Sequence, residues 1–579
     1  MCGIFGFFLN RKLNDLDIIK GKKQTEYLNH RGPDGKGFSY IKDKGLFLGH
    51  TRLSILDLSS KANQPMKKHN MIISFNGEIY NFLEIKNFLI SKGYSFFSKS
   101  DTEVLLSAFH YWGVDAVKKL DGMFSIALYM NRKIFLISDY FLEKPLFYYS
   151  NDEGVFFSSE PKCIINMLGL KKKNLNPINF VALGFILDGK TGFNNINSLS
   201  QATVIEFDKN KNKKIKKYWR FPIKKFSGKR KIDSQFLDEF TDLLILSIKR
   251  RLRSDVNLGL FLSSGIDSKL IATLLKFELK KNIDTFTFSF PGSYDESRDV
   301  RRFCNYLNIN NRNFYSKKHR DFDEKLLLNI FSYPNDNTTS ISINTMCKSI
   351  KNKYKVIISG VGGDELTIGY NKYHFIKKFS YLYNNPNFSN ALVNLINLFG
   401  INTKKTKLLN YYFRGSKSWK LTALKNGNSL KFNKDLFDSI SFNNLRNNSG
   451  CFLTDILNFD LEQTLPFSYL SAIDRGSMRE GVEIRTPFLN KVLFEKISEL
   501  DISNLIMNQK VLFKKILSRY LPQKLINNKK RGFVQPVYTS KTKNNKFKKL
   551  SNFSYKLKGE DYNSMKVISR INLINSFYS

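Results

Sequence analysis

The chain has 579 residues, 42% hydrophobic and 25% charged, which is typical of folded globular proteins and excludes wholesale disorder. At roughly 150 residues per domain, this length predicts about four units or two large ones. The longest apolar runs, such as residues 180–187, are far shorter than the ~20 residues of a membrane helix. The amino terminus lacks the basic and apolar regions of a signal peptide, so we expect a cytoplasmic protein with no membrane partner.

The formal net charge is +43, from 93 Lys and Arg against 50 Asp and Glu. Such a balance can indicate binding to nucleic acid, but the lysines are scattered and no nucleic-acid-binding signature accompanies them. We therefore interpret the basic runs at residues 211–217 and 541–549 as a solvated loop and a tail, and we expect no nucleic-acid partner. The five cysteines have no repeated spacing, which argues against a disulfide framework or a zinc knuckle.

Short strands and a few helices are predicted over the first ~205 residues. Residues 71–75 resemble a strand that breaks at Asn76-Gly77, and Asn81 can then cap a helix that ends by Gly93. Further runs of strand length cover residues 123–129 and 134–137. Residues 207–231 are polar and basic, so we place the domain junction there.

The pattern after the junction alternates helices with short apolar strands. Expected helices cover residues 236–252 and 269–280, and expected strands cover residues 258–262, 285–290 and 356–358. Alternation of this kind predicts an α/β, doubly wound parallel sheet with a helical carboxyl-terminal part. Residues 375–450 are rich in Asn, Lys and Phe and suggest a helical elaboration. The predicted domains are 2–206 and 232–579.

Cys2 is the most informative single residue of the chain. Removal of Met1 would leave a cysteine whose own α-amine can take the proton of its thiol, because the two groups have reference pKa values of about 7.7–8.0 and 8.5. Such a thiol suits attack on an amide carbonyl. A buried or incidental cysteine is the alternative on position alone.

Other residues of the first half predict a pocket around that thiol. Asn76 and Gly77 can offer a side-chain amide and a backbone N–H to a developing oxyanion. Arg52 can hold a ligand carboxylate bidentately, and Glu78 and Asp101 can hold a ligand ammonium. A thiol next to one group that binds a carboxylate and two that bind an ammonium is the arrangement expected of a pocket for glutamine.

These residues lie in motifs that resemble a known family. The motifs are Met1-Cys2-Gly3-Ile4, His30-Arg31-Gly32-Pro33-Asp34, Arg52-Leu53-Ser54-Ile55, Asn76-Gly77-Glu78-Ile79-Tyr80-Asn81 and Ser100-Asp101-Thr102-Glu103. They resemble the glutaminase domain of class II glutamine amidotransferases and, within that group, glutamine-dependent asparagine synthetases. The resemblance implies an α+β N-terminal-nucleophile fold with two stacked antiparallel sheets flanked by helices. It implies Cys2, Asn76 and Gly77 as catalytic residues, and Arg52, Leu53, Ser54, Ile55, Asn76, Gly77, Glu78 and Asp101 as glutamine-binding residues.

The run of residues 139–146 departs from the same family pattern at two positions. Leu142 stands where the family has Gly, and Ser138 where it has Arg. Both departures fall outside the motifs assigned to the thiol site, so we expect glutaminase activity to be retained.

A second set of motifs predicts a nucleotide site. Residues 262–268 follow a strand and precede a helix, where small residues let backbone N–H groups close on a phosphate. The run has no lysine, unlike the P-loop of ordinary NTPases, and it resembles the pyrophosphate-binding loop of ATP pyrophosphatases, with Ser264 in place of a Gly. The resemblance implies ATP as a substrate, and its expected contacts are Leu262, Ser263, Gly265, Asp267, Ser268, Phe288, Ser359, Gly360 and Lys510. For Phe288, a place in the core is an equally good interpretation.

Magnesium is the expected cofactor, because Asp267 and Asp364 offer the oxygen ligands that it prefers next to phosphates. Lys510 would neutralise phosphate charge. Residues 474–478, 483–489 and 529–533 also match the carboxyl-terminal signatures of asparagine synthetases.

Three positions depart from the family where the acyl acceptor should lie. Val361 replaces a Glu thought to assist the acyl-adenylate step, Asn311 replaces a His, and Asn337 replaces an Asp unless Asp336 takes its place. The acceptor is therefore the open part of the prediction.

The resemblance predicts a glutamine-hydrolysing asparagine synthetase, with glutamine, ATP and aspartate as its small-molecule partners and ammonia passing internally. One alternative keeps this chemistry but amidates another carboxylate, such as a sugar uronic acid in surface polysaccharide synthesis. A second alternative is a regulatory protein with a decayed site, against which the intact Cys2, Asp267 and Asp364 argue. A homodimer is compatible with the sequence, which does not fix the oligomeric state.

Overall fold

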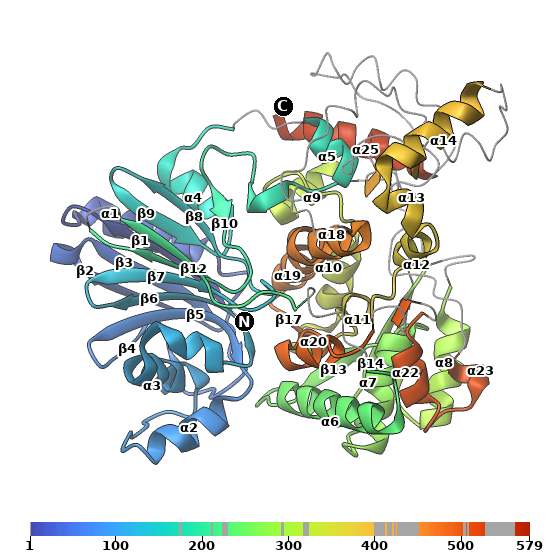
Figure 1. The fold of residues 1–579 in the computed structure, drawn as a ribbon. Coiled ribbons are helices and arrows are strands. Elements are labelled where there is room, and N and C mark those ends of the chain that lie inside the picture. The colour runs from blue at the N-terminus through green and yellow to red at the C-terminus, as the bar shows by residue number, and fades with distance from the viewer. Residues whose placement is uncertain are drawn as a thin grey trace.

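The computed structural model describes residues 2–172, 177–209, 212–222, 230–290, 295–315, 323–398, 412–413, 420–421, 424, 451–501, 505–506, 509–526 and 562–578. Figure 1 shows two parts side by side, with the amino-terminal sheets on the left and the carboxyl-terminal half on the right. The predictions for residues 529–533 and 541–549 lie outside the described residues.

The amino-terminal part holds two antiparallel sheets, which confirms the predicted stacked-sheet class. The first has the strand order β10-β8-β9-β1-β3-β2 and the second the order β12-β11-β7-β6-β5-β4. Strand bounds in the first sheet are β1 Gly3–Leu9, β2 Gly35–Ile41, β3 Leu46–Arg52, β8 Phe147–Asn151, β9 Gly154–Ser158 and β10 Asn197–Ser198. In the second they are β4 Met66–Lys68, β5 Met71–Ile79, β6 Gly122–Met130, β7 Lys133–Ser138, β11 Thr203–Phe207 and β12 Lys213–Lys217. The flanking helices are α1 Asp15–Glu26, α2 Phe82–Ile90, α3 Asp101–Trp112, α4 Pro161–Leu168 and α5 Pro177–Leu183.

β1 is buried along its whole length and fills the centre of the first sheet. Its aromatic side chains pack against those of neighbouring strands, as in the stacked pair Phe7 and Phe47, whose ring centroids lie 5.1 Å apart. Gly6 leaves room for the Phe157 ring, since a Cβ there would lie 2.6 Å from it. Gly3 pairs with Thr51 of β3, and this register brings Cys2 to the same end of the sheet as Arg52.

Three local expectations in this part were wrong. β5 does not break at Asn76-Gly77 but continues to Ile79, paired throughout with β6. Asn81 does not cap α2 with its side chain, which instead bonds the backbone of Lys119 and Asp121. Residues 213–217, assigned to the domain junction, form β12 on the edge of the second sheet.

The carboxyl-terminal half contains a parallel sheet with the strand order β15-β14-β13-β16-β17. The strands are β13 Leu258–Phe261, β14 Thr285–Ser289, β15 Asn311–Tyr315, β16 Val356–Ile358 and β17 Glu483–Arg485. The chain runs outward from β13 to β15 and then returns to the other side of β13 with β16. Ligands of doubly wound sheets bind at the carboxyl ends of strands where the order reverses, which is here between β13 and β16.

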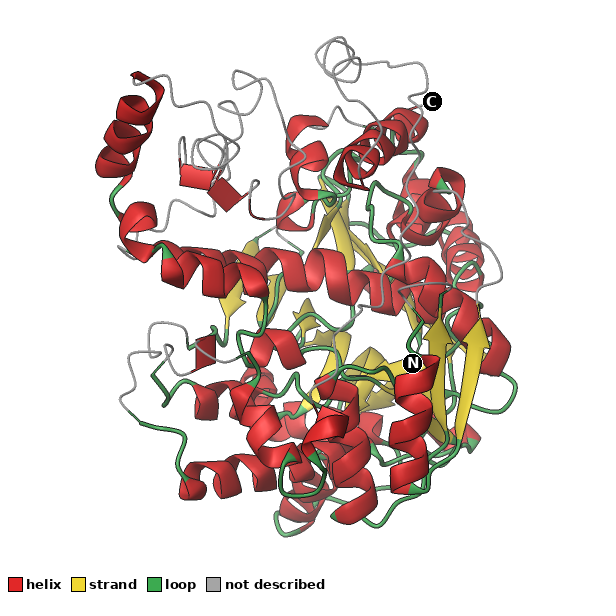
Figure 2. Ribbon diagram, turned by 90° about the vertical axis from the view of Figure 1, so that its right-hand side faces the viewer, coloured by secondary structure: helices red, strands yellow, loops and turns green. Residues whose placement is uncertain are grey.

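Helices surround this sheet, and Figure 2, which turns the right-hand side of Figure 1 toward the viewer, shows mostly helices in front. Their bounds are α6 Ser234–Arg251, α7 Ile266–Phe277, α8 Ser297–Leu307, α9 Glu324–Phe331, α10 Thr339–Ile350, α11 Gly363–Leu366, α12 Asn371–Lys378, α13 Ser380–Asn384, α14 Pro386–Leu398, α18 Phe452–Phe459, α19 Ser471–Met478, α20 Lys491–Ile497, α22 Val511–Leu517, α23 Gln523–Ile526 and α25 Tyr562–Tyr578. A π-helical segment, Asp460–Leu470, joins α18 to α19. In the described part of the chain, none of these helices is long and apolar enough to span a bilayer.

Candidate active sites

Cys2 lies between the two amino-terminal sheets, directly before β1. Its backbone nitrogen donates to Asn76 Oδ1 on β5 at 2.8 Å, and the next backbone nitrogen, of Gly3, donates to Thr51 Oγ1 at 3.1 Å. The side chain is buried, with 7% of the residue exposed. The start of the chain is therefore fixed in position by both sheets.

Burial makes the Cys2 thiol harder to ionise. Burial raises its pKa above the ordinary value, although a hydrogen bond from the Leu53 backbone and the charge of Arg52 act in the opposite direction. Because the thiolate is the nucleophile, such a thiol needs a base close at hand. The amine that removal of Met1 would expose belongs to the same residue.

Asn76 and Gly77 present the features of an oxyanion hole. Asn76 is fully buried, and its Nδ2 donates to no acceptor among the described residues. Gly77 has φ +149°, and a Cβ there would lie 2.0 Å from the Met123 carbonyl oxygen, so no other residue fits. A buried amide donor next to the thiol fits an oxygen that becomes negatively charged during attack.

Arg52 is held by the loop that follows β3. Its guanidinium donates to the Ser59 carbonyl and to Asn63 Oδ1, both at 2.8 Å, and also to the Asp57 carbonyl. Within the same loop, Leu53 and Ile55 are buried, and the Ser54 nitrogen donates to Asp34 Oδ2 at 2.7 Å. The structure thus brings the whole predicted Arg52–Ile55 segment to the thiol end of β1.

Buried carboxylates from both halves of the chain meet beside this site. Arg485 of β17 lies 2.5 Å from Glu483 and 3.4 Å from Glu78. Burial and the charge of Glu483 raise the pKa of Glu78 well above its usual range, and burial raises the pKa of Asp101 to about 6. Burial alone would also raise the pKa of Glu483, but Arg485 holds it below its ordinary value. The predicted ammonium binders Glu78 and Asp101 therefore lie against β17 of the second half.

A second link between the halves starts at the backbone of Cys2. The fully buried Arg31 donates from Nε to the Cys2 carbonyl at 3.3 Å and from Nη2 to Asp474 Oδ1 of α19 at 3.0 Å. Glu160 joins this network, 3.3 Å from Arg31 and 3.0 Å from Arg475. The two links fix the thiol site against α19 and β17.

An apolar cluster also joins the two halves. It consists of Leu53, Ile55, Tyr80 and Met123 from the first half and Val356 and Met478 from the second. All six are buried, so the region between the halves excludes bulk water at this point.

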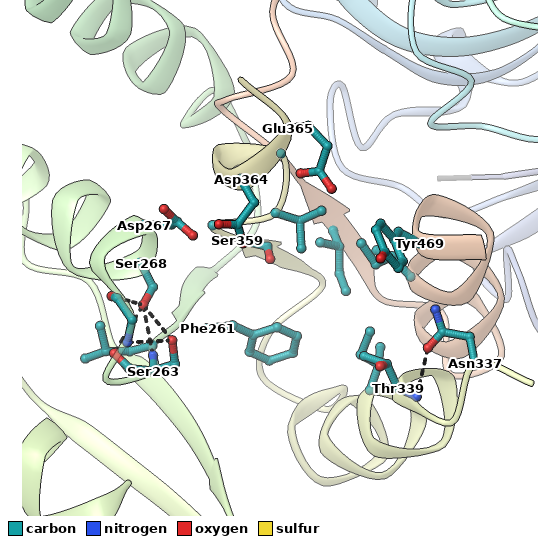
Figure 3. A pocket seen from close by; sticks show the side chains of 18 of the residues that line it. Phe261, Ser263, Asp267, Ser268, Asn337, Thr339, Ser359, Asp364, Glu365 and Tyr469 are labelled. Atoms are coloured by element: carbon teal, nitrogen blue, oxygen red, sulfur yellow. Dashed lines mark hydrogen bonds between the residues drawn. The ribbon is translucent and has the colours of Figure 1, made fainter. Parts of the chain in front are cut away.

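A cavity of about 370 Å³ lies at the reversal point of the parallel sheet. Figure 3 shows Ser263, Asp267, Ser268, Ser359 and Asp364 on one side of it, and Asn337, Thr339 and Tyr469 on the other. We call these sides the phosphate-loop end and the acceptor end. The cavity is also lined by Phe261, Leu262, Gly265, Glu296, Ile343, Gly360, Val361, Gly362, Glu365, Tyr370, Ile473 and Ile484.

The phosphate-loop end is a tight turn between β13 and α7. The Ser263 nitrogen donates to Ser268 Oγ at 3.0 Å, and Glu296 accepts from the Ser264 nitrogen at 2.9 Å. Gly265 is the N-cap residue of α7 and has no side chain to cap the first backbone N–H groups of the helix. The positive end of the helix therefore faces a site suited to an anion.

Two loops and a distant lysine converge on one pair of carboxylates. Lys510 Nζ lies 2.8 Å from Asp364 and also bonds both oxygens of Asp267. Gly363 permits this approach, because a Cβ there would lie 2.7 Å from the Asp267 carboxyl carbon. Both aspartates already hold a cation, which fits the prediction that they could hold magnesium between phosphate oxygens. Across the described residues, no group of three or more His, Cys, Asp or Glu side chains forms a metal site by itself.

Not every predicted nucleotide contact lines the cavity. Leu262, Ser263, Gly265, Asp267, Ser268, Ser359 and Gly360 line it, and Lys510 reaches it through the two aspartates. Phe288 instead packs in a core cluster with Phe290 and Met346, as in the alternative interpretation of that residue.

The three residues that depart from the family pattern do not all lie at the cavity. Val361 and Asn337 line the cavity, as expected for the acceptor region. Asn311 does not line it, because its amide donates to Thr285 and Thr287 at the edge of the sheet, each at 2.9 Å. Asp336 does not take the place of Asn337, since its carboxylate is paired with Arg570.

Several lining residues had no assigned role in the sequence. Thr339, Tyr469, Tyr370 and Glu365 come from separate segments, and Tyr370 donates to Glu365 at 2.6 Å. Only Glu365 carried a local signal, since it follows Asp364 in the Gly-rich turn.

Comparison with known proteins agrees with this geometry. Residues 1–219 match the family described as glutamine amidotransferase domain, and residues 239–556 match the family described as asparagine synthase. A Methanocaldococcus jannaschii protein, provisionally named asparagine synthetase (glutamine-hydrolyzing) 2, is 33% identical over 407 residues, covering 64% of this chain and 76% of its own. The asparagine synthetase (glutamine-hydrolyzing) 1 of Bacillus subtilis is 27% identical over 566 residues, covering 93% and 87%. With a glutamine amidotransferase half built around Cys2 and a second half built around the cavity, the chain belongs to the asparagine synthase family of ligases.

Proposed function

We propose that this protein is a glutamine-dependent asparagine synthetase. Glutamine, aspartate, ATP and water give glutamate, asparagine, AMP and pyrophosphate. A bare carboxylate has no leaving group, so the acceptor is first joined to the α-phosphorus of ATP with loss of pyrophosphate, and ammonia then displaces AMP. The observation that carries this proposal is β17, whose Ile484 lines the cavity while its neighbours Glu483 and Arg485 contact the thiol site.

The glutaminase step uses groups that already contact one another. The Cys2 thiol attacks the glutamine side-chain carbonyl, and the α-amine of the same residue takes the thiol proton and then delivers it to the departing ammonia. Water then hydrolyses the thioester that is left, which releases glutamate and restores the thiol. Asn76 Nδ2 and the Gly77 backbone stabilise the oxyanion. Arg52 binds the glutamine carboxylate, and Glu78 and Asp101 bind its ammonium. The Asn76 donor that is buried beside Cys2 supports this assignment.

The synthetase step takes place in the cavity. The α7 N-terminus and the residue 262–268 turn hold the pyrophosphate that leaves, and Lys510 moves from the aspartates to phosphate oxygens. When bound between Asp267 and Asp364, magnesium supplies charge neutralisation at the phosphates. Glu365 and Tyr370 place polar groups next to the reacting carboxylate.

The apolar cluster at Leu53, Ile55, Met123, Val356 and Met478 supports internal transfer of ammonia. Uncharged ammonia crosses apolar surroundings more easily than ammonium does, because an ion loses its hydration at a large cost in free energy. A water-poor contact between the halves would therefore keep the nitrogen in its reactive form.

The acceptor has a second candidate, favoured by Val361 and Asn337 at the cavity. Neither side chain can act as the acid that family members which make asparagine carry at these positions. The alternative acceptor is a sugar uronic acid, whose hydroxyl groups suit neutral polar side chains at this end of the cavity.

One experiment compares the two acceptors directly. Purified protein with glutamine and Mg·ATP is supplied with aspartate or with a panel of uronic acids, and AMP, pyrophosphate and the amide product are measured. We expect aspartate-dependent AMP and asparagine in equal amounts. If AMP forms with a uronic acid but not with aspartate, the uronic acid is the acceptor. If no AMP forms with any of the acids, the synthetase proposal is overturned.

A further inference from the structure

The carboxyl-terminal helix α25 lies beyond both family matches, the second of which ends at residue 556. Figure 1 shows it next to α5 of the amino-terminal half. Arg570 is the buried charged residue at this contact, with 2% of its surface exposed. A buried guanidinium is stable only if it is paired and fully hydrogen-bonded, so its partners are informative.

Arg570 connects three separate segments. Its Nε lies 2.5 Å from Asp336 Oδ2, and its Nη1 donates to the carbonyls of Val181 at 2.7 Å and Ala182 at 3.2 Å. These carbonyls belong to the last turn of α5, the negative end of that helix. The guanidinium thus joins α25, α5 and the segment that contains Asp336.

Asp336 directly precedes the acceptor end of the cavity. Asn337, its neighbour in the chain, lines the cavity and accepts from the Thr339 nitrogen at 3.1 Å, and Thr339 also lines the cavity as the first residue of α10. Gly184, just after α5, packs on the other side of Asp336, where a Cβ would lie 2.3 Å from a carboxylate oxygen. The Asp336 nitrogen donates to the Gly184 carbonyl at 2.8 Å.

We propose that α25 is a positioning element of the acceptor end, in which Arg570 fixes Asp336 and thereby sets the position of Asn337 and Thr339. The inference rests on the proposed function only for the identity of the molecule at that end. Arg570 acts through Asp336 and does not itself contact the substrate.

The test compares wild type with Arg570→Gln, Arg570→Lys and Gly184→Ala. Amide hydrogen exchange is followed in residues 335–345 and, as an internal reference, in residues 262–268. We expect exchange in residues 335–345 to rise about tenfold in Arg570→Gln and in Gly184→Ala. The reference segment should not change. Arg570→Lys keeps the charge but loses the forked contacts, so it should give a smaller effect.

Steady-state kinetics with aspartate as the probe give a second readout. The KM for aspartate should rise about tenfold in Arg570→Gln, while the KM for ATP and the glutaminase kcat stay within about twofold. The matched control is Lys172→Met, which removes a bond to the Phe577 carbonyl at the other end of α25 without touching Asp336. It should leave both the exchange and the KM for aspartate unchanged.

Two outcomes would overturn the proposal. In the first, hydrogen exchange changes equally in residues 335–345 and 262–268 and both the synthetase and glutaminase activities fall in parallel, so that α25 is only a general structural support. In the second, exchange in residues 335–345 does not change, so that α25 has no link to the site. If wild type forms no AMP with aspartate, the proposed acceptor fails, but the exchange measurement still decides the role of Arg570.

Discussion

The thiol site and the cavity are built in different ways. Around Cys2, the oxyanion donors and the Arg52 loop come from β1, β3 and β5, which are neighbours in two sheets, and their polar groups contact one another directly. The cavity is lined by segments that lie between residues 261 and 484 and meet only through long-range packing. A site built from adjacent strands is preorganised by the sheets themselves, whereas the cavity depends on contacts made far along the chain.

The largest test of this division is Cys2→Ala. Loss of the nucleophile should reduce glutamine-dependent amide formation by about 10⁴-fold or more. Ammonia-dependent formation of AMP and the amide should stay within about twofold of wild type, because the cavity does not use the thiol. Both activities are measured on the same preparation with glutamine or ammonium chloride as nitrogen source.

Cys451→Ala is the matched control, because Cys451 is a half-buried cysteine of the second half that does not line the cavity. It should retain both activities. Equal loss of the two activities in Cys2→Ala would contradict the separation of the sites.

The reverse experiment is Asp267→Asn. Removing one of the two carboxylates that hold Lys510 should lower AMP formation by about 10²–10³-fold, because the phosphate charge is no longer balanced by the same set of groups. Glutaminase activity, measured as glutamate release, should be retained. The control is Asp238→Asn on α6, which loses an exposed ion pair with Arg519. It should change neither reaction. A parallel fall in glutamate release would show that the sites are not separable in this way.

The smallest expected effect is a pH dependence at the thiol site. Burial raises the pKa of Asp101 to about 6, so this carboxyl group is ionised above that pH and protonated below it. Ionised Asp101 adds its own negative charge to the site of the glutamine ammonium, so kcat/KM for glutamine should fall as the pH drops below about 6, by at most about tenfold per pH unit. The KM for ATP should show no limb at this pH.

Asp101→Asn identifies the group responsible. The variant should have low kcat/KM throughout and should lack the limb near pH 6. A limb that persists unchanged in the variant would assign the titration to another group.

The structure brings the residues predicted for the thiol site together, and these residues lie in short contiguous motifs. Asn76 and Gly77 are adjacent, and the register of β1 against β3 brings Cys2 to Arg52 without help from distant segments. The strand break predicted at Asn76-Gly77 failed because pairing with β6 outweighs the local turn preference of these residues. β12 was missed for a related reason, since its lysines hide a strand that is held by β11.

The acceptor end could not be predicted in the same way. Asn337 was identified as a departure from a pattern, but its position depends on Asp336 and on Arg570, which lies 234 residues away. A contact between residues so far apart leaves no pattern of hydrophobic residues in the local sequence. The role of Phe288 was equally open from sequence, and its packing against Phe290 and Met346 is visible only in three dimensions.

The lysines of β12 have a consequence for how copies of the protein meet. This strand is the last of its sheet, and Lys213, Lys214 and Lys216 are exposed on it, around an exposed Ile215. A second copy approaching this edge would bring its own cationic strand alongside, and like charges facing each other across a ladder repel. Pairing of β12 with the β12 strand of a second copy is therefore disfavoured.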